Sequence, residues 1–374
     1  MFCQLCDSNP TRKYNKGTII SSQSSKYEQS SKGGEMAKTK VGINGFGRIG
    51  RQVFRTISER HSDTLEVVAI NDLGSAVTNA HLFKFDSTYG RYSGTVEEKN
   101  GALIIDRQSI TSFSERDPYK IKWGDVGVEI VIESTGFFTD ATKAAGHLKG
   151  GAKKVIISAP AKNEDITVVL GVNDGMYDPA VHNVVSNASC TTNCVAPMAK
   201  VLHDSFGIES ALMSTIHAYT NDQKILDQVH SDLRRSRAAA NSIIPTTTGA
   251  AKAVTLVIPE LAGKIDGMAY RVPVITGSVT DLTVKLESKA SLVDVNEAYR
   301  QASMKGSLHH ILGYSEEPLV SVDYIGNPNS CTIDSLATSA VGDNFVKVVG
   351  WYDNEWGYSS RTADLANFMV EKGI

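Results

Sequence analysis

A glycine-rich turn between a strand pattern and a helix pattern is the feature that most restricts how this chain can fold. Residues 40–44 form an apolar strand pattern, residues 45–50 read Gly-Phe-Gly-Arg-Ile-Gly, and residues 51–57 have the spacing of a helix. A second strand pattern over residues 65–70 is followed by Asp72, about 20 residues after the turn, as a dinucleotide-binding unit requires. The glycines of such a unit let backbone N–H groups approach a pyrophosphate at a helix N-terminus. The pattern predicts an α/β fold with a Rossmann dinucleotide-binding domain; a turn with only a packing role is the alternative.

Asp72 also bears on the choice of cofactor. A carboxylate at this position accepts hydrogen bonds from ribose hydroxyls and repels a 2′-phosphate. Leu73 and Gly74 follow it and bring no positive charge that could compensate. The sequence therefore favours NAD over NADP.

A cysteine lies at a second junction between a strand pattern and a helix pattern. Cys190 follows the apolar stretch 181–185 and precedes helical spacing over residues 194–202. At a helix N-terminus, unpaired N–H groups and the helix dipole stabilise a thiolate, which predicts a reactive thiol with a lowered pKa. His217 ends another strand pattern, and a histidine brought close by folding is the usual activator of such a thiol. The alternatives are a cysteine that only packs and a histidine with a structural role.

The chain after Cys190 has a different character. Strand patterns over residues 267–274 and 278–285 follow each other with few helix patterns between them, and helical spacing returns over residues 359–372. This predicts an α+β catalytic domain with a mixed or antiparallel sheet. A chain of 374 residues with 41% hydrophobic content is long enough for two such domains.

Charge and cysteine usage argue against several classes of partner. The net charge is −3, so nucleic acid is not expected as a main partner. No run of about 18 apolar residues occurs, so no membrane association is expected. Five cysteines, an odd number, fit free thiols in a reducing compartment and predict a cytoplasmic location.

The first 36 residues differ from the rest in composition. They are rich in Ser, Lys, Gln and Gly, which predicts a disordered N-terminal extension over residues 1–36. Cys3 and Cys6 look like half of a zinc site, but no second Cys/His pair follows at zinc-finger spacing, so no metal is expected. The segment lacks the apolar core of a secretory signal, and its few arginines weaken a targeting role. Met36 is a candidate start of the folded domain, preceded by an isoform extension or a gene-model artefact.

Several longer motifs occur in one order and spacing. They are Gly42-Ile-Asn-Gly-Phe-Gly-Arg-Ile-Gly50, Glu133-Ser-Thr-Gly136, Ser189-Cys-Thr-Thr-Asn-Cys194, His217-Ala-Tyr-Thr220, Thr248-Gly-Ala-Ala251, Arg271-Val-Pro273 and Trp351-Tyr-Asp-Asn-Glu-Trp-Gly-Tyr358. Through this set, the chain from about Lys38 to its C-terminus resembles the phosphorylating glyceraldehyde-3-phosphate dehydrogenases.

The resemblance implies a domain organisation. It places an NAD-binding Rossmann domain at residues 37–188, completed by a C-terminal helix over residues 355–374, and a catalytic domain at residues 189–354. It also implies a homotetramer in which the loop around the basic run 232–237 lies at a subunit interface near a neighbour's cofactor site. Gln228-Val229, at the start of this loop, departs from the pattern of NAD-specific relatives, so the strictness of the NAD preference stays open.

The resemblance further implies roles for individual residues. Cys190 is the expected nucleophile and His217 the expected base. The residues expected to bind NAD are Asn44, Gly45, Phe46, Gly47, Arg48, Ile49, Asp72, Arg116, Ser134, Thr135, Ser158 and Asn354. The residues expected to bind the substrate phosphate are Thr220, Asp222 and Arg271, and those expected to bind inorganic phosphate are Ser189, Thr191, Thr248 and Gly249.

The implied activity is oxidation of glyceraldehyde 3-phosphate with NAD and inorganic phosphate to 1,3-bisphosphoglycerate, through a cysteine hemithioacetal and a thioester. Two alternatives remain. A dehydrogenase acting on erythrose 4-phosphate shares the thiol but releases a free acid, and a non-catalytic nucleotide- or RNA-binding role uses the Rossmann domain alone. The direction of the reaction in metabolism and any secondary role stay open.

Overall fold

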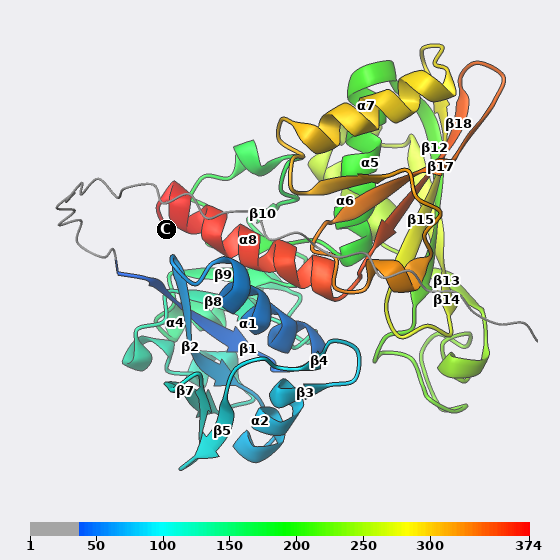
Figure 1. Ribbon diagram of the computed structural model, residues 1–374. Coiled ribbons are helices and arrows are strands. Elements are labelled where there is room, and N and C mark those ends of the chain that lie inside the picture. The colour runs from blue at the N-terminus through cyan, green and yellow to red at the C-terminus, as the bar shows by residue number, and fades with distance from the viewer. Residues whose placement is uncertain (1–36) are drawn as a thin grey trace, which may run out of the picture. The chain divides into compact units, whose positions relative to one another are not determined.

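The structure, a computed structural model, describes residues 37–374 (Figure 1). The extension predicted over residues 1–36 lies outside the described residues, as do Cys3 and Cys6. The described part contains two large sheets with helices packed on them, which confirms the predicted α/β class with a mixed second sheet.

The first sheet is built around β1 (Thr39–Asn44), which pairs in parallel with β2 (Leu65–Asn71) and β8 (Ile130–Glu133). The strand order is β10-β11-β9-β8-β1-β2-β7-β6-β5, so the chain turns from one side of β1 to the other between β1 and β8. In open α/β sheets, ligands bind outside the carboxyl ends of the strands at such a switch point. The ends of β1 and β8 therefore place the glycine turn and Ser134 at the expected binding position.

The remaining strands of this sheet, and a separate two-stranded pair, have these bounds. They are β5 (Val96–Lys99), β6 (Ala102–Ile105), β7 (Gln108–Phe113), β9 (Lys154–Ile157), β10 (Ile166–Thr167) and β11 (Val184–Ser186), with the pair β3 (Phe85–Asp86) and β4 (Gly90–Arg91).

The start of β11 differs from the sequence prediction. We expected a strand over residues 181–185, but pairing begins at Val184. The N–H groups of Val181 and His182 donate to the Asp178 carbonyl in a turn, so they are not free for a sheet ladder.

The second sheet has the order β13-β14-β12-β15-β18-β17-β16 and mixes parallel and antiparallel pairs. Its strands are β12 (Ile208–Ala218), β13 (Ile244–Thr247), β14 (Ile265–Val272), β15 (Ser278–Leu286), β16 (Leu312–Ser315), β17 (Cys331–Val341) and β18 (Phe345–Tyr352). The central pair β12 and β14 runs in parallel, so both strands end on the same side of the sheet.

The helices connect and cover these sheets. Their bounds are α1 (Arg48–Arg60), α2 (Ala76–Lys84), α3 (Ala141–Ala144), α4 (Gly146–Lys149), α5 (Cys190–Phe206), α6 (Ala250–Val257), α7 (Leu292–Met304) and α8 (Trp356–Lys372). Short 3₁₀ turns occupy Pro118–Lys120, Trp123–Val126, Asp174–Met176, Ala239–Asn241, Pro259–Leu261 and Ser321–Tyr324.

The last helix returns to the first sheet. Figure 1 shows α8 alongside α1, and the Thr56 hydroxyl donates to the Ser359 carbonyl at 3.3 Å. In the middle of α8, Asp364 accepts from Arg60 and His61 at the end of α1, so the two helices are joined by polar contacts as well as by packing.

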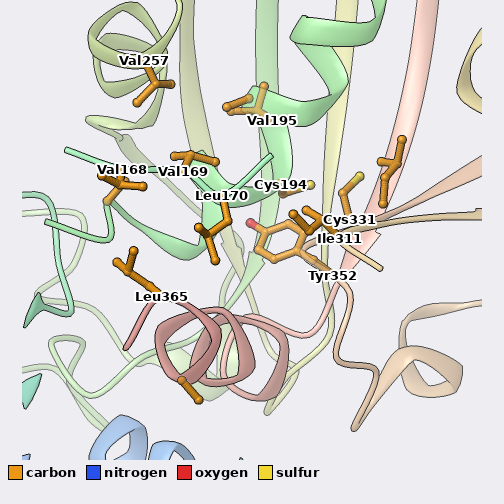
Figure 2. Close-up of a cluster of buried hydrophobic side chains, with 14 of the residues drawn as sticks. Val168, Val169, Leu170, Cys194, Val195, Val257, Ile311, Cys331, Tyr352 and Leu365 are labelled. Atoms are coloured by element: carbon orange, nitrogen blue, oxygen red, sulfur yellow. The ribbon is translucent and has the colours of Figure 1, made fainter. Parts of the chain in front are cut away.

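A continuous apolar core joins α5, α8 and the second sheet. Figure 2 shows Cys194 on α5 close to Cys331 and Tyr352, and these residues belong with Val195 and Leu365 to one buried cluster. Helix α5 is therefore fixed on its buried side, and its first residue, Cys190, cannot shift without disturbing this core.

The glycine turn that leads into α1 has no room for a side chain at two of its glycines, Gly45 and Gly50. A Cβ atom on Gly50 would lie 2.1 Å from the Gly45 carbonyl oxygen, whereas a Cβ on Gly47 meets nothing within 4 Å. Helix α1 begins at Arg48, inside the turn and earlier than the predicted Arg51, with Gly47 as its N-cap.

We therefore expect Gly50→Ala and Gly47→Ala to differ in stability. Gly50→Ala forces the turn and the helix apart, and we expect the free energy of unfolding to fall by about 2 kcal/mol or more. Gly47→Ala changes only an N-cap preference, and we expect a loss below about 1 kcal/mol. Urea unfolding of both variants and wild type at one protein concentration measures the difference. Equal losses would contradict the close approach at Gly50.

Candidate active site

The position of Cys190 is set by a left-handed residue before it. Ala188 has φ +53° and is fully buried, a conformation that costs free energy for a residue with a Cβ. The Tyr358 hydroxyl donates to the Ala188 carbonyl at 2.8 Å, and the Ser186 hydroxyl accepts from the Ala188 N–H at 3.0 Å. Ser189 then caps α5, since its hydroxyl accepts from the Thr192 N–H at 3.0 Å. Cys190 is thereby the first residue of α5.

His217 reaches the thiol from the second sheet. It lies near the end of β12, and its Nε2 is 3.3 Å from the Cys190 Sγ. Its Nδ1 is 2.7 Å from the Ala218 carbonyl oxygen. Arg271 occupies the paired position on β14, and its Nη1 is 2.5 Å from His217 Nδ1. The structure therefore brings the predicted cysteine and histidine together.

The electrostatics of the pair differ from the sequence prediction. Burial and, to a smaller extent, the Arg271 guanidinium lower the pKa of His217 to about 3. Burial raises the pKa of the Cys190 thiol, although Arg271 and hydrogen bonds from Thr191 oppose that rise. The lowered thiol pKa that we expected from the helix N-terminus is therefore wrong, because desolvation outweighs the stabilising groups. The pair consists of a thiol and a neutral imidazole.

A cavity of about 610 Å³ opens over this pair. It is lined by Cys190 and His217, and by residues of the glycine turn, of the ends of β8 and β9, and of α8. The predicted site residues that line it are Gly47, Arg48, Ile49, Ser134, Thr135, Ser158, Ser189, Cys190, His217, Thr220 and Asn354.

A second cavity, of about 480 Å³, shares Gly47, Ser134 and Thr135 with the first. The predicted residues that line it are Asn44, Gly45, Gly47, Asp72, Arg116, Ser134 and Thr135. Because these three residues line both cavities, the two cavities are continuous across the glycine turn. The combined length of the two cavities, and their position at the start of α1, suit a dinucleotide whose pyrophosphate lies at the turn.

Asp72 is held firmly at the second cavity. Its carboxylate accepts the Phe46 N–H at 2.9 Å and the Gly74 N–H at 2.7 Å. Phe46 is itself buried and does not line the cavity, so it contributes its backbone to the site and not its ring. The anchored carboxylate is suited to accept ribose hydroxyls, which fits NAD.

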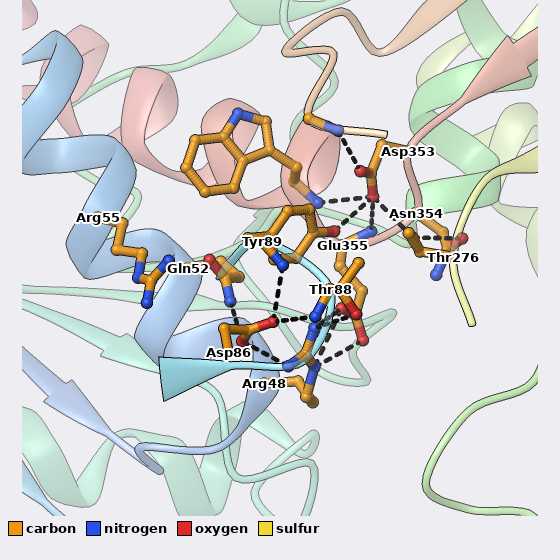
Figure 3. Close-up of polar contacts among 12 residues, drawn as sticks. Arg48, Gln52, Arg55, Asp86, Thr88, Tyr89, Thr276, Asp353, Asn354 and Glu355 are labelled. Carbon is orange, nitrogen blue, oxygen red and sulfur yellow. Dashed lines mark hydrogen bonds and ion pairs between the residues drawn. The ribbon is translucent and has the colours of Figure 1, made fainter. Parts of the chain in front are cut away.

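Asn354 is oriented by two hydroxyl groups. Its Oδ1 accepts from Ser278 at 2.8 Å and from Thr276 at 3.3 Å, so its amide N–H₂ is left to face the cavity. Figure 3 shows this amide beside Asp353, which accepts from the Tyr89 hydroxyl at 2.8 Å. An amide donor fixed in this way suits the carboxamide of a nicotinamide ring.

Arg48 is held by carboxylates from two distant segments. It pairs with Asp86 at 2.5 Å and with Glu355 (Figure 3). The guanidinium thus ties the start of α1 to the segment before α8, and this contact closes one wall of the first cavity.

We predicted no role for Glu133 from the sequence, yet its buried carboxylate holds residues that line the second cavity. It accepts the Thr135 N–H at 2.8 Å, the Asn44 amide at 2.5 Å and the His147 Nε2 at 3.0 Å. Trp123 donates to the other nitrogen of His147 at 3.0 Å, which leaves Nε2 as the protonated nitrogen. The motif Glu133-Ser-Thr-Gly136 was the available signal.

The predicted phosphate ligands are only partly gathered at the cavity. Thr220 lines it and donates to Asp222, whereas Arg271 contacts His217. Thr191 is hydrogen-bonded to Tyr352 at 3.0 Å, and Thr248 and Gly249 precede α6; none of these three lines the first cavity. Arg235, which the sequence treats only as part of a basic run, pairs with Asp222 at 2.6 Å.

Further lining residues of the first cavity were not predicted. Tyr219 and Tyr358 lie inside motifs quoted from the sequence, so the motifs held the signal, whereas Pro160 and Ile275 lie outside them. Among residues 37–374, no helix is long and apolar enough to cross a membrane. In the same range, no group of three His, Cys, Asp or Glu side chains is arranged to hold a metal ion.

A dinucleotide cavity that runs on to a cysteine–histidine pair defines an oxidoreductase with a covalent thiol mechanism as the class of protein. Two family models match this chain: "Glyceraldehyde 3-phosphate dehydrogenase, NAD binding domain" over residues 39–141, and "Glyceraldehyde 3-phosphate dehydrogenase, C-terminal domain" over residues 189–354. The chain belongs to the glyceraldehyde 3-phosphate dehydrogenase family, and its cofactor is NAD.

Individual relatives are similar over nearly their whole length. Glyceraldehyde-3-phosphate dehydrogenase 2 of Streptomyces avermitilis is 58% identical over 330 residues, which is 88% of this chain and 98% of the relative. Glyceraldehyde-3-phosphate dehydrogenase of Geobacillus stearothermophilus is 58% identical over 335 residues, 90% of this chain and 99% of the relative. Glyceraldehyde-3-phosphate dehydrogenase 1 of Bacillus subtilis is 56% identical over 335 residues, with the same coverage.

The anchored carboxylate of Asp72 leads to a prediction on cofactor choice. We expect NAD to bind at least about tenfold more tightly than NADP, because a carboxylate against a phosphate costs on the order of 1.4 kcal/mol or more. Asp72→Asn keeps the shape and removes the charge, so the ratio of the two dissociation constants should fall. Asp125→Asn, an exposed carboxylate of a 3₁₀ turn, is the control. Comparable binding of both cofactors by wild type would show that the loop at Gln228-Val229 outweighs Asp72.

Proposed function

We propose that the chain oxidises glyceraldehyde 3-phosphate with NAD and inorganic phosphate to 1,3-bisphosphoglycerate, with Cys190 as nucleophile and His217 as general base. The observation that carries the proposal is the 3.3 Å contact between Cys190 Sγ and His217 Nε2, at the floor of a cavity continuous with the dinucleotide cavity. The names of the family and of its relatives support the substrate.

The first step forms the bond between sulfur and the aldehyde carbon. Because His217 is neutral and Cys190 is protonated, the thiol proton passes to Nε2 as the sulfur attacks the carbonyl carbon. The carbonyl oxygen then takes this proton from Nε2, so that a hemithioacetal results and His217 is neutral again. The Cys190 N–H has no partner inside α5, since it is the first residue of the helix, and it can donate to the developing oxyanion.

The second step oxidises the hemithioacetal. His217 accepts the hydroxyl proton while the carbon loses a hydride, and a thioester to Cys190 remains. NAD, when bound, supplies the hydride acceptor. The amide of Asn354 and the hydroxyl of Ser158 line the same cavity and are suited to orient the nicotinamide end.

The third step releases the product. An oxygen of inorganic phosphate attacks the thioester carbon, the carbon–sulfur bond breaks, and the acyl phosphate leaves while Cys190 regains a proton. We assign inorganic phosphate to Ser189, Thr191, Thr248 and Gly249, and the phosphate of the substrate to Thr220, Asp222 and Arg271. Hydroxyl, guanidinium and backbone N–H donors of this kind bind oxyanions.

Assembly and domain limits belong to the same proposal. We infer a homotetramer, supported by exposed apolar side chains between β12 and β13, where Ile225, Val229 and Leu233 are 84%, 92% and 82% exposed. The domain limits follow as 37–188 with 355–374 for NAD and 189–354 for catalysis. The cytoplasmic location stays a prediction from the free cysteines.

An activity assay tests the proposal directly. We expect NADH formation from glyceraldehyde 3-phosphate to require phosphate or arsenate, and Cys190→Ser to abolish it. His217→Asn should lower turnover by about 10²- to 10⁴-fold if His217 is the general base. Equal turnover without phosphate, or faster turnover on erythrose 4-phosphate, would favour the hydrolytic alternative.

The pH dependence of thiol labelling tests the protonation state of the pair. Because the Cys190 pKa is raised, its reaction with iodoacetamide should keep accelerating above about pH 8.5, the ordinary value of a free thiol. No step should appear between pH 5 and 7, since the pKa of His217 is about 3. Mass spectrometry should find the label on Cys190 ahead of Cys194 and Cys331, which are fully buried. A labelling rate already constant at pH 7 would show a preformed thiolate.

A further inference from the structure

Three sulfur atoms lie together in the core beside α5. Cys194 and Met198 are one turn apart on this helix, and the Cys194 thiol donates to the Met198 Sδ at 3.8 Å. Cys331, the first residue of β17, brings the third sulfur, and its thiol is in hydrogen-bond contact with that of Cys194 (Figure 2). All three side chains are fully buried. We call these three residues the sulfur cluster.

The three sulfurs converge over a glycine of the neighbouring strand. A Cβ atom on Gly350 of β18 would lie 2.5 Å from the Cys331 Sγ and 2.7 Å from the Met198 Sδ. The Cys194 Sγ is 3.7 Å from the carbonyl oxygen of the same glycine. The sulfurs therefore share the space that a side chain at position 350 would fill.

The main chain holds each member of the sulfur cluster in place. The Tyr299 hydroxyl of α7 donates to the Met198 carbonyl at 2.8 Å. Cys331 pairs with Leu312 where β17 runs beside β16. A helix and a strand thus bring the sulfur donors together before any ligand binds, which reduces the ordering that binding requires.

The spacing of the sulfur cluster fits a metal ion. A bond between a metal and a thiolate is about 2.3 Å long, so three sulfurs around one ion in a plane lie about 4 Å apart. The 3.8 Å between the sulfurs of Cys194 and Met198 is close to this spacing. Two cysteines alone fall short of three ligands, and the thioether of Met198 supplies the third. Thiolate and thioether ligands select soft ions such as Cu(I).

We propose that Cys194, Met198 and Cys331 form a binding site for one soft monovalent cation of the Cu(I) class. The site lies outside the dinucleotide cavities and is independent of the proposed function. It uses none of the residues to which that function assigns a role.

The charge of the sulfur cluster favours a monovalent ion. Burial and the neighbouring Cys194 thiol raise the pKa of Cys331 well above its ordinary value, so its thiol is neutral when no cation is bound. One proton leaves to solvent when one monovalent cation binds, and the buried cluster gains no net charge. Zn²⁺ carries a second charge and takes four ligands in a tetrahedron, one more than the sulfur cluster offers.

A role in packing alone is the competing interpretation. Buried cysteine behaves as a small apolar residue, and methionine fills irregular gaps in cores. This interpretation predicts that the sulfur cluster takes up no ion, whereas the proposed site predicts one ion per chain.

The test titrates Cu(I) into the full chain. Replacing Cys3, Cys6 and Cys190 with serine removes competing thiols and leaves Cys194 and Cys331 as the only cysteines. Cu(I) is supplied under nitrogen as its bicinchoninate complex, whose colour falls as the protein takes the ion. We expect this background variant to take up one Cu(I) per chain. Because the sulfur cluster is buried, copper is also counted in protein produced in copper-supplemented cells, where the ion can enter during folding.

Three further substitutions in this background identify the ligands. Cys331→Ser should weaken Cu(I) binding at least about 100-fold, and Met198→Leu, which keeps the volume, at least about tenfold. Met369→Leu changes an equally buried methionine of α8 and should bind like the background variant. X-ray absorption at the copper edge should show three sulfur neighbours in the background variant and two in Met198→Leu. Near-UV circular dichroism checks that each variant is folded.

A folded background variant that takes up no Cu(I) by either route would overturn the site and leave the sulfur cluster with a packing role. Equal affinities of Met198→Leu and Met369→Leu would overturn the three-sulfur site, and tighter binding of Zn²⁺ than of Cu(I) would overturn the assignment to a soft monovalent cation. None of these results bears on the proposed function, which the NADH assay with Cys190 in place tests separately.

Discussion

The chemistry of this chain depends on where the backbone places the first residue of α5. Ala188 adopts a left-handed conformation that a buried alanine tolerates only because its N–H and its carbonyl are both held, the latter by Tyr358 of α8. This kink directs the chain from the end of β11 into α5 and leaves Cys190 at the cavity floor. The C-terminal helix thus does more than cover the first sheet, because its tyrosine fixes the residue two positions before the nucleophile.

The two sheets position the cofactor-binding residues and the catalytic residues by the same geometric rule. Parallel strands bring their carboxyl ends to one edge, so β1 and β8 deliver the cofactor residues and β12 and β14 deliver His217 and Arg271. Gly47, Ser134 and Thr135 border both cavities and join these halves. Beneath the cofactor residues, the buried Glu133 carboxylate accepts hydrogen bonds from the Asn44 amide, the Thr135 N–H and His147. These bonds hold the residues around it in place and offset the cost of burying a carboxylate.

Local patterns predicted most of this arrangement. The glycine turn, Asp72 and the motif around Cys190 sit at strand ends, and strand ends are visible in the sequence. Properties that depend on the three-dimensional surroundings of a side chain could not be predicted from the sequence. The pKa of Cys190 is shifted in the direction opposite to that expected, because a helix N-terminus can be inferred from spacing but desolvation by the surrounding core cannot. In the same way, Arg271 could be assigned to a phosphate by its motif, yet its contact with His217 arises only from the register of β12 against β14.

A neutral thiol–imidazole pair has a thermodynamic advantage in this position. A buried thiolate–imidazolium pair would have to overcome the desolvation of two ions, and Arg271 beside the imidazolium would add repulsion between like charges. Keeping both groups neutral until an aldehyde arrives avoids that cost in the resting enzyme. Charge then develops only when the sulfur attacks, at which point the N–H groups at the start of α5 face the new oxyanion. The same burial that makes Cys190 a weak acid therefore keeps the stabilising groups of the site available for the transition state, where they lower the barrier.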